Sequence, residues 1–428
     1  MVNIAKVNIW EQFAGAVIWD EDSKKASFEF DENFIKKGLD LSPVMMPIVT
    51  ARNGTVFSFP SLNYDTFKGL PGLLADALPD RFGNQIIDAW LAATGRTSES
   101  FNPVERLCYI GRRGMGALEF EPAVMSEKSN PVEIENLVML ANDILRNRKD
   151  FKADLTDKGV HEIFRVGTSA GGARAKAVIA YNPQTGEVRS GQIDGLNGFE
   201  YWLIKFDGVS ETQLLETKGY GNIEYAYYLM ALDCGIEMSE CRLLRENGRS
   251  HFMTKRFDRS GEDKIHMQTL CAIAHYDYNE PRSYAYEQAF QIMRQLRLPY
   301  SDAEQLFRRM VFNVVANNRD DHTKNISFLM DKTGKWRLSP AYDVSYAYDP
   351  GNKWISAHQL SVNGKRTDIS KEDLIEVAKQ MNIKKPSEII EQVVDSVSRW
   401  KEFAKVAEVP KDVAGKIMKV LLLYRSKK

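Results

Sequence analysis

Asn318-Arg319-Asp320-Asp321-His322-Thr323-Lys324-Asn325 stands between a long helical stretch and a predicted β-hairpin. The four residues between Asp320 and Asn325 allow one short loop to present a proton acceptor and, one turn later, an amide oxygen. A further carboxylate follows in Ser339-Pro340-Ala341-Tyr342-Asp343. Mg²⁺ prefers hard oxygen ligands and takes one or two from the protein, with phosphate oxygens completing its shell. The spacing therefore predicts a phosphoryl-transfer loop in which Asp320 is the base and Asn325 and Asp343 bind the metal.

The segments on both sides of this loop have clear periodicities. Residues 302–316 carry an apolar stripe at helical spacing, which consists of Leu306, Phe307, Met310, Val311, Val314 and Val315. Residues 326–329 and 336–338 are predicted to pair as a hairpin around a turn that ends at Gly334. The loop is therefore expected to join the end of a buried helix to a hairpin.

Upstream residues supply the other parts that phosphoryl transfer needs, a backbone cradle and a cation for the phosphates. Gly171-Gly172 lies in a glycine-rich turn before a β run at 177–181, and Lys205 lies near the end of the next strand, at 201–206. Glu224 opens a predicted helix and is a candidate partner for Lys205 by analogy with protein kinases. Each feature is common by itself, and their order along the chain carries the prediction.

The chain is predicted to begin with β-structure and to become mostly helical toward its C-terminus. Residues 7–9, 13–18 and 25–30 alternate with a period of two. Helices dominate after Gly261, where Ser370 opens a capping box. The predicted fold class is α+β.

The composition is that of an ordinary globular protein. The 428 residues carry 57 Lys and Arg against 58 Asp and Glu, so the chain lacks the basic field behind non-specific nucleic-acid binding. The four cysteines include no C-x-x-C pair, which argues against a zinc knuckle or a disulfide framework. The N-terminus has no signal-like apolar region and charges interrupt every apolar stretch, so we expect a cytoplasmic protein without a membrane span.

Three other kinds of site fit the sequence less well. The glycines at 111–116 resemble a dinucleotide loop, but residues 117–120 continue as a predicted strand rather than a helix, so we interpret this segment as a turn. The acidic residues at 320–321, His322 and Asp343 could bind a transition metal, but the six histidines form no H-x-H or H-x-x-x-H pair. A serine hydrolase is not supported because no G-x-S-x-G is present.

The loop at 318–325 together with residues 339–343 resembles the signature of HipA-type serine/threonine kinase toxins. Other segments resemble that family in the same order, namely 78–83, 110–112, 116–120, 169–176 and 257–259. The resemblance implies a two-lobed, protein-kinase-like fold. Its parts would be a β-rich N-terminal cap at 1–150, an ATP-binding β lobe at 151–260 and a helical catalytic lobe at 261–428.

The resemblance also implies roles for individual residues, with ATP and Mg²⁺ as cofactors. Asp320 would accept the proton of the substrate hydroxyl, and Asn325 and Asp343 would hold Mg²⁺. Ser169 falls where members of the family are autophosphorylated, and its added charge could displace the loop from the ATP site. The residues expected to contact ATP are Ser169, Ala170, Gly171, Gly172, Ala173, Lys205, Lys255, Phe257, His322 and Lys324. Lys255 departs from the family pattern, which has glutamate there, so a backbone contact with adenine would survive and a side-chain contact would not.

Family members phosphorylate an aminoacyl-tRNA synthetase and pair with a small helix-turn-helix antitoxin that binds DNA. The resemblance implies such a protein substrate and antitoxin here, with DNA contacted mainly through the antitoxin because the chain is nearly neutral. Two alternatives stay open on the sequence: a kinase of small-molecule or lipid hydroxyls built from the same parts, and a pseudokinase that serves as an interaction module in a repressor complex.

Overall fold

The computed structural model describes residues 2–79, 81–93, 95–123, 133–146, 175–191, 196–209, 219–261 and 263–424. The chain divides into two compact units built from discontinuous segments. The first unit comprises residues 1–218, 244–268 and 330–335, and the second comprises 219–243, 269–329 and 336–428. The strands β8 (Cys241–Glu246), β12 (His266–Thr269) and β14 (Ser327–Met330) carry the chain from one unit to the other. The three-part division expected from the sequence stays a prediction.

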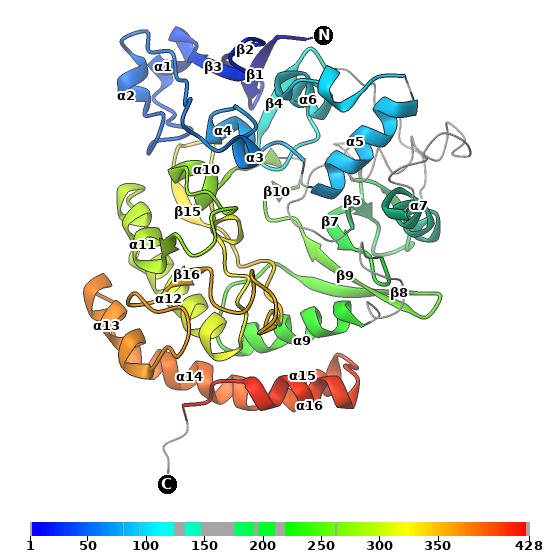
Figure 1. Ribbon diagram of the computed structural model, residues 1–428, viewed down its shortest axis with the longest axis vertical. Coiled ribbons are helices and arrows are strands. Elements are labelled where there is room, and N and C mark those ends of the chain that lie inside the picture. The colour runs from blue at the N-terminus through cyan, green and yellow to red at the C-terminus, as the bar shows by residue number, and fades with distance from the viewer. Residues whose placement is uncertain are drawn as a thin grey trace. The chain divides into compact units, whose positions relative to one another are not determined.

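The first unit begins with an antiparallel sheet (Figure 1). Its strands are β1 (Ile4–Ile9), β2 (Gln12–Asp20), β3 (Lys25–Phe30) and β4 (Leu118–Glu121), in the order β3-β2-β1-β4. Val7, Val17 and Phe28 point into the core and are fully buried, which is the period-two pattern that predicted these strands. The helices of this unit are α1 (Glu32–Lys37), α2 (Ile48–Ala51), α3 (Tyr64–Phe67), α4 (Gly72–Ala75), α5 (Arg81–Ala93), η1 (Ser98–Ser100), α6 (Pro103–Ile110) and α7 (Ile134–Arg146).

A second antiparallel sheet in this unit carries Lys205. Its strands are β5 (Lys176–Tyr181), β6 (Val188–Ser190), β7 (Glu200–Lys205), β9 (Arg249–Lys255) and β8, in the order β6-β5-β7-β9-β8. Lys205 lies at the end of β7, opposite Lys176 on β5 and Phe252 on β9. The strands predicted around residues 177–181 and 201–206 are confirmed. A short ribbon of β10 (Arg259–Ser260) and β11 (Asp263–Lys264) follows.

A buried group of charges joins the turn after α6 to the segment after β9. The Asp258 carboxylate accepts hydrogen bonds from Arg256 (2.6 Å), Arg259 (2.9 Å) and the backbone N–H of Gly116 (2.7 Å). Both arginines also donate to the carbonyl of Gly114, each at 3.2 Å. Burial alone would raise the pKa of Asp258, but the two guanidinium groups outweigh it and hold the pKa far below its usual range. The sequence predicts a structural turn at 111–116. The buried charge group holds this turn in place through hydrogen bonds to Gly114 and Gly116.

The second unit is mostly helical, as predicted. Its helices are α9 (Tyr220–Asp233), α10 (Leu270–Ala274), α11 (Tyr286–Gln295), α12 (Tyr300–Val315), α13 (Lys371–Met381), α14 (Pro386–Ser398), α15 (Trp400–Val406) and α16 (Lys411–Val420). The predicted apolar stripe of α12 is fully buried, and this helix packs against α11 and α14. The capping box at Ser370 starts α13. Strand β14 pairs with β15 (Trp336–Leu338), which confirms the predicted hairpin, and β13 (Tyr284–Ala285) pairs in parallel with β16 (Leu360–Ser361).

No helix within the described ranges has both the length and the apolar character needed to cross a bilayer.

Acid is expected to destabilise the first unit through the buried His266. Its Nε2–H donates to the carbonyl of Leu41 (3.1 Å), and burial lowers the pKa of His266 to about 4. Because the unfolded chain binds the proton near pH 6.5, unfolding is favoured progressively as the pH falls from 6.5 to 4. This one group should reduce the free energy of unfolding by about 3 kcal/mol over that range.

Urea denaturation at pH 7, 5.5 and 4.5 measures this effect. His266→Gln keeps an N–H donor without the titration, so its stability should fall less steeply with pH than that of the wild-type chain. Equal slopes for the two proteins would contradict the assignment.

Candidate active site

The loop at 318–325 begins where α12 ends and is shaped by its own backbone contacts. Asn317 adopts a left-handed conformation (φ 52°), which asparagine tolerates better than most residues. The N–H of Asn318 donates back to the carbonyl of Asn313 (2.9 Å). His322 caps the short 3-10 helix η2 (Thr323–Asn325), with its Nδ1 accepting from the N–H of Lys324 (3.3 Å). The loop then continues into β14, as the sequence predicted.

Asn325 and Asp320 are joined within this loop. The Asn325 amide nitrogen donates to the backbone carbonyl of Asp320 (2.8 Å), which leaves the amide oxygen of Asn325 as the atom able to bind a cation. The Asp320 side chain is 47% exposed, and its Oδ1 lies 3.8 Å from Nε2 of His322. The four-residue spacing therefore places the exposed carboxylate of Asp320 and the oriented amide of Asn325 in one turn.

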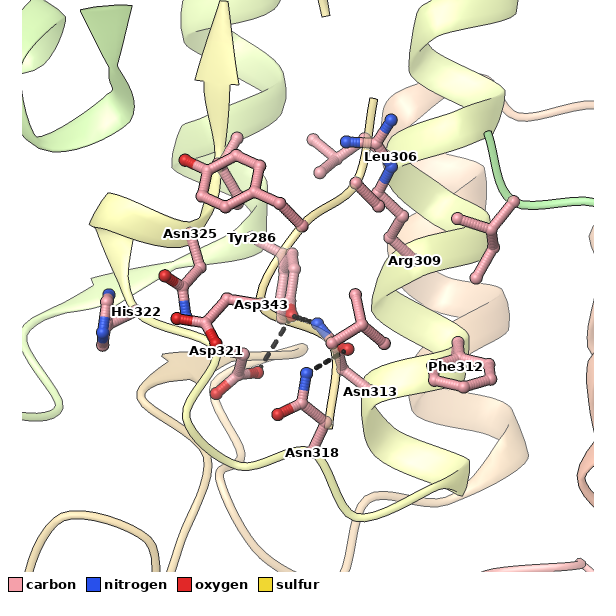
Figure 2. A pocket seen from close by; sticks show the side chains of 15 residues that line it. Tyr286, Leu306, Arg309, Phe312, Asn313, Asn318, Asp321, His322, Asn325 and Asp343 are labelled. Carbon is pink, nitrogen blue, oxygen red and sulfur yellow. Dashed lines mark hydrogen bonds between the residues drawn. The ribbon is translucent and has the colours of Figure 1, made fainter. Parts of the chain in front are cut away.

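Asp343 shares a pocket with Asn325 (Figure 2). Figure 2 shows the carboxylate of Asp343 beside the amide of Asn325, with Asp321 below them. The cavity measures about 30 Å³, which suits an ion or about one or two water molecules rather than a nucleotide. Asp343 itself has a left-handed backbone (φ 54°).

The oxygen atoms of Asn325 and Asp343 fit a magnesium ion that shares its shell with phosphates. Both side chains are hard oxygen donors, the kind that Mg²⁺ prefers. Across the residues that the structure describes, no group of three or more His, Cys, Asp or Glu side chains forms a site that could hold a metal. An ion held by two protein ligands and substrate phosphates is the usual arrangement for Mg²⁺, whereas a complete protein cage is not.

The hydroxyl of Tyr342 ties the Asp343 segment to the Asn325 segment. It donates to the backbone carbonyl of Lys324 (2.5 Å) and is hydrogen-bonded to the hydroxyl of Ser327. Tyr342 precedes Asp343, and Lys324 precedes Asn325. One phenol therefore fixes the spacing between the two candidate metal ligands.

Removing this hydroxyl in Tyr342→Phe should weaken both the fold and the metal site. The carbonyl of Lys324 and the buried hydroxyl of Ser327 lose a partner, which should lower the free energy of unfolding by about 1–2 kcal/mol. Mg²⁺-ATP binding, measured by calorimetry, should weaken in parallel. Tyr225→Phe, which preserves a ring stacked on Tyr228, is the matched control. Unchanged binding and stability in Tyr342→Phe would contradict this role.

In the first unit, the segment after Lys205 is held by a buried histidine. The backbone N–H of Asp207 donates to Nδ1 of His251 (2.9 Å), and Nε2 of His251 lies 3.1 Å from a carboxylate oxygen of Glu246. Burial lowers the pKa of His251, which favours the neutral ring that this acceptor role requires. Lys176, directly opposite Lys205, is only 3% exposed.

The remaining predicted ATP contacts of the first unit are partly described. Nζ of Lys255 donates to Glu200 (2.5 Å), and Phe257 stands between Arg256 and Asp258 of the buried charge group. Ser169, Ala170, Gly171, Gly172 and Ala173 lie outside the described residues, so their predicted contacts are neither supported nor contradicted.

His322 and Lys324, also predicted to contact ATP, both touch Tyr278. Nζ of Lys324 lies 4.9 Å from the centre of the Tyr278 ring, and the His322 ring lies 5.7 Å from it. Glu224 is buried at 2% exposure on α9. The ATP contacts of His322 and Lys324 and the pairing of Glu224 with Lys205 stay predictions.

Two family models match the chain. Residues 168–401 match the HipA-like C-terminal domain, and residues 5–121 match the HipA N-terminal domain. A HipA chain from Shewanella oneidensis, solved in a complex of toxin, HipB antitoxin and operator DNA, has the same fold. The two chains superimpose with a TM-score of 0.69 at 15% identity, over 97% of this chain and 94% of the other. The α+β, protein-kinase-like fold is therefore confirmed.

Two other proteins match more weakly or over less of their length. A Sinorhizobium fredii protein named "Putative kinase Y4mE" is 26% identical over 136 residues, which is 29% of this chain and 32% of that protein. This chain thus spans about a third of that relative. The Helicobacter pylori proinflammatory kinase CtkA matches with a TM-score of 0.32 at 14% identity, over 53% of this chain and 93% of that one.

Proposed function

Because the chain belongs to the HipA family, we propose that it is an ATP-dependent serine/threonine protein kinase of the HipA type. Its reaction would transfer the γ-phosphoryl group of ATP to a protein hydroxyl, with autophosphorylation on Ser169. The observation that carries the proposal is the Asn325 amide. Its nitrogen is committed to the Asp320 carbonyl while its oxygen shares a pocket with Asp343.

Each residue has a distinct task in this proposal. Asp320 accepts the proton of the attacking hydroxyl, for which its exposed carboxylate is suited. Asn325 and Asp343 would hold Mg²⁺, which supplies charge neutralisation for the phosphates when it is bound. Lys205 is proposed to contact the phosphates and the backbone at 255–257 to contact adenine. His322 and Lys324 are proposed to lie beside ATP.

The proposed partners follow from the family. The Shewanella chain was solved with HipB and operator DNA, so we propose a small DNA-binding antitoxin as the partner of this chain. A translation component such as an aminoacyl-tRNA synthetase is the proposed substrate, and the cytoplasm is the proposed location. The near-neutral charge supports a DNA contact that comes mainly through the antitoxin.

Labelled ATP with a cell lysate tests the proposal. The chain, Mg²⁺ and γ-labelled ATP should label a discrete protein band, and mass spectrometry should find phosphate on the peptide that contains Ser169. Label confined to small molecules or lipids would favour the alternative hydroxyl kinase. Failure to bind Mg²⁺-ATP in a thermal-shift assay would favour a pseudokinase module.

A further inference from the structure

Asp321, the neighbour of the proposed base, has a buried carboxylate that accepts three hydrogen bonds. The donors are the hydroxyl of Tyr286 (2.9 Å), Nδ1 of His358 (2.9 Å) and the backbone N–H of Gln359 (2.7 Å). Its side chain is 1% exposed, whereas that of Asp320 is 47% exposed. Consecutive aspartates therefore have opposite environments: one faces solvent and the other is held inside the unit.

The pairing of β13 with β16 explains why these donors converge. Tyr284 and Ala285 pair in parallel with Leu360 and Ser361. Tyr286 directly follows β13, and His358 and Gln359 directly precede β16. Two short strands that lie about 75 residues apart in the sequence thus deliver both side chains to the same loop.

The network also reaches the beginning of the loop. Nδ2 of Asn313, on α12, donates to the hydroxyl of Tyr286 (2.9 Å), and Nδ2 of Asn318 donates to Oδ1 of Asn313 (3.0 Å). Figure 2 shows this chain of contacts between α12 and the loop. Residues 318 and 321 are therefore both anchored, and Asp320 lies between them.

The carboxylate of Asp321 determines the tautomer of His358. A carboxylate can only accept, so Nδ1 of His358 must carry the hydrogen. Nε2 of His358 is buried and has no hydrogen-bond partner among the described residues. Both oxygens of Asp321 are engaged by donors, which also argues against the metal-ligand role considered for it from the sequence.

We propose that Asp321, held by Tyr286 and His358, is the positioning residue that fixes the backbone of residues 318–321 so that Asp320 keeps its working orientation. This inference rests on the proposed kinase function. It predicts that damage to the network lowers turnover while nucleotide binding is preserved, because none of these three side chains belongs to the proposed ATP contacts.

Steady-state autophosphorylation and nucleotide binding together test the proposal. In Asp321→Asn an amide N–H replaces one of the accepting oxygens, so the hydrogen bonds to Tyr286 and His358 must rearrange and the loop shifts; turnover should fall about 10²-fold with KM for ATP within about twofold of wild type. Tyr286→Phe removes a single hydrogen bond and should cost about fivefold in turnover. Tyr300→Phe is the matched control, since its hydroxyl accepts from the N–H of Lys384 (2.8 Å) at the other end of α12. Wild-type turnover in Tyr286→Phe and in a folded Asp321→Asn would overturn the proposal.

The tautomer of His358 gives a readout that is independent of activity. Two-bond ¹H–¹⁵N spectra of histidine-labelled protein, assigned with His358→Gln, should show Nδ1 protonated in the wild-type chain. In Asp321→Asn the hydrogen should move to Nε2. An Nε2–H tautomer in the wild-type chain would refute the network.

A wild-type chain with the Nδ1–H tautomer but without phosphate incorporation would instead refute the kinase function, while the hydrogen-bond network around Asp321 would still be supported. If Asp321→Asn does not fold, the turnover of Tyr286→Phe and the His358 tautomer in the wild-type spectrum test the proposal instead.

Discussion

Asp320→Asn should reduce phosphate incorporation by about 10²–10⁴-fold, because the amide cannot accept the proton of the attacking hydroxyl. The substitution is nearly isosteric, and the side chain is 47% exposed. The fold should therefore survive, with far-UV circular dichroism and the thermal midpoint close to those of the wild-type chain. Rapid-quench measurements with γ-labelled ATP give the rate of transfer, and a thermal-shift titration gives nucleotide affinity, which should be preserved.

Asp395→Asn serves as the surface control, since its carboxylate is 77% exposed on α14. It should transfer phosphate at the wild-type rate. Undiminished autophosphorylation in Asp320→Asn would contradict the assignment of Asp320 as the base and leave the loop as a purely structural feature.

Asp343→Asn should be almost as damaging, for a different reason. It removes the anionic member of the proposed metal-ligand pair, and loss of one electrostatic stabiliser of this kind costs about 10²–10³-fold in turnover. Asparagine tolerates the left-handed backbone at this position, so conformational strain should not add to the effect. Because the defect lies in metal binding, the Mg²⁺ concentration for half-maximal rate should rise, and excess Mg²⁺ should restore part of the activity.

Asp349→Asn is the control for this second variant. It neutralises an aspartate that accepts a hydrogen bond from the N–H of Gly351 (2.8 Å) on a nearby loop. Its Mg²⁺ dependence should match that of the wild-type chain. An unchanged Mg²⁺ dependence in Asp343→Asn would exclude Asp343 as a ligand.

Local patterns in the sequence predicted much of this protein. The stripe of α12, the hairpin of β14 and β15 and the alternation of β1–β3 all follow from periodicity over a few residues. The Asp320–Asn325 spacing likewise works within one turn, and the structure realises it with one hydrogen bond. Such features depend on neighbouring residues, which is why a single sequence is enough to find them.

Contacts between distant segments could not be predicted in this way. The sequence around Tyr286 and around His358 contains no motif that points to Asp321. The two-residue pairing of β13 with β16 brings both side chains to Asp321. The two segments joined by Asp258 each have a recognisable sequence, but neither indicates that residues 142 positions apart share a hydrogen bond. The environment of Asp321, unlike that of Asp320, follows from long-range packing rather than from its own position in the loop.

The buried charge group at Asp258 also limits how this protein can be divided or recombined. The N-terminal family model ends at residue 121 and the C-terminal one begins at 168, so the two look like exchangeable modules. Yet the guanidinium groups of Arg256 and Arg259 find carbonyl acceptors on the turn at 114–116. A fragment that starts at the C-terminal model would leave these buried cations short of acceptors. A chimera of two relatives would need to inherit the turn and the Arg256–Arg259 segment from the same parent.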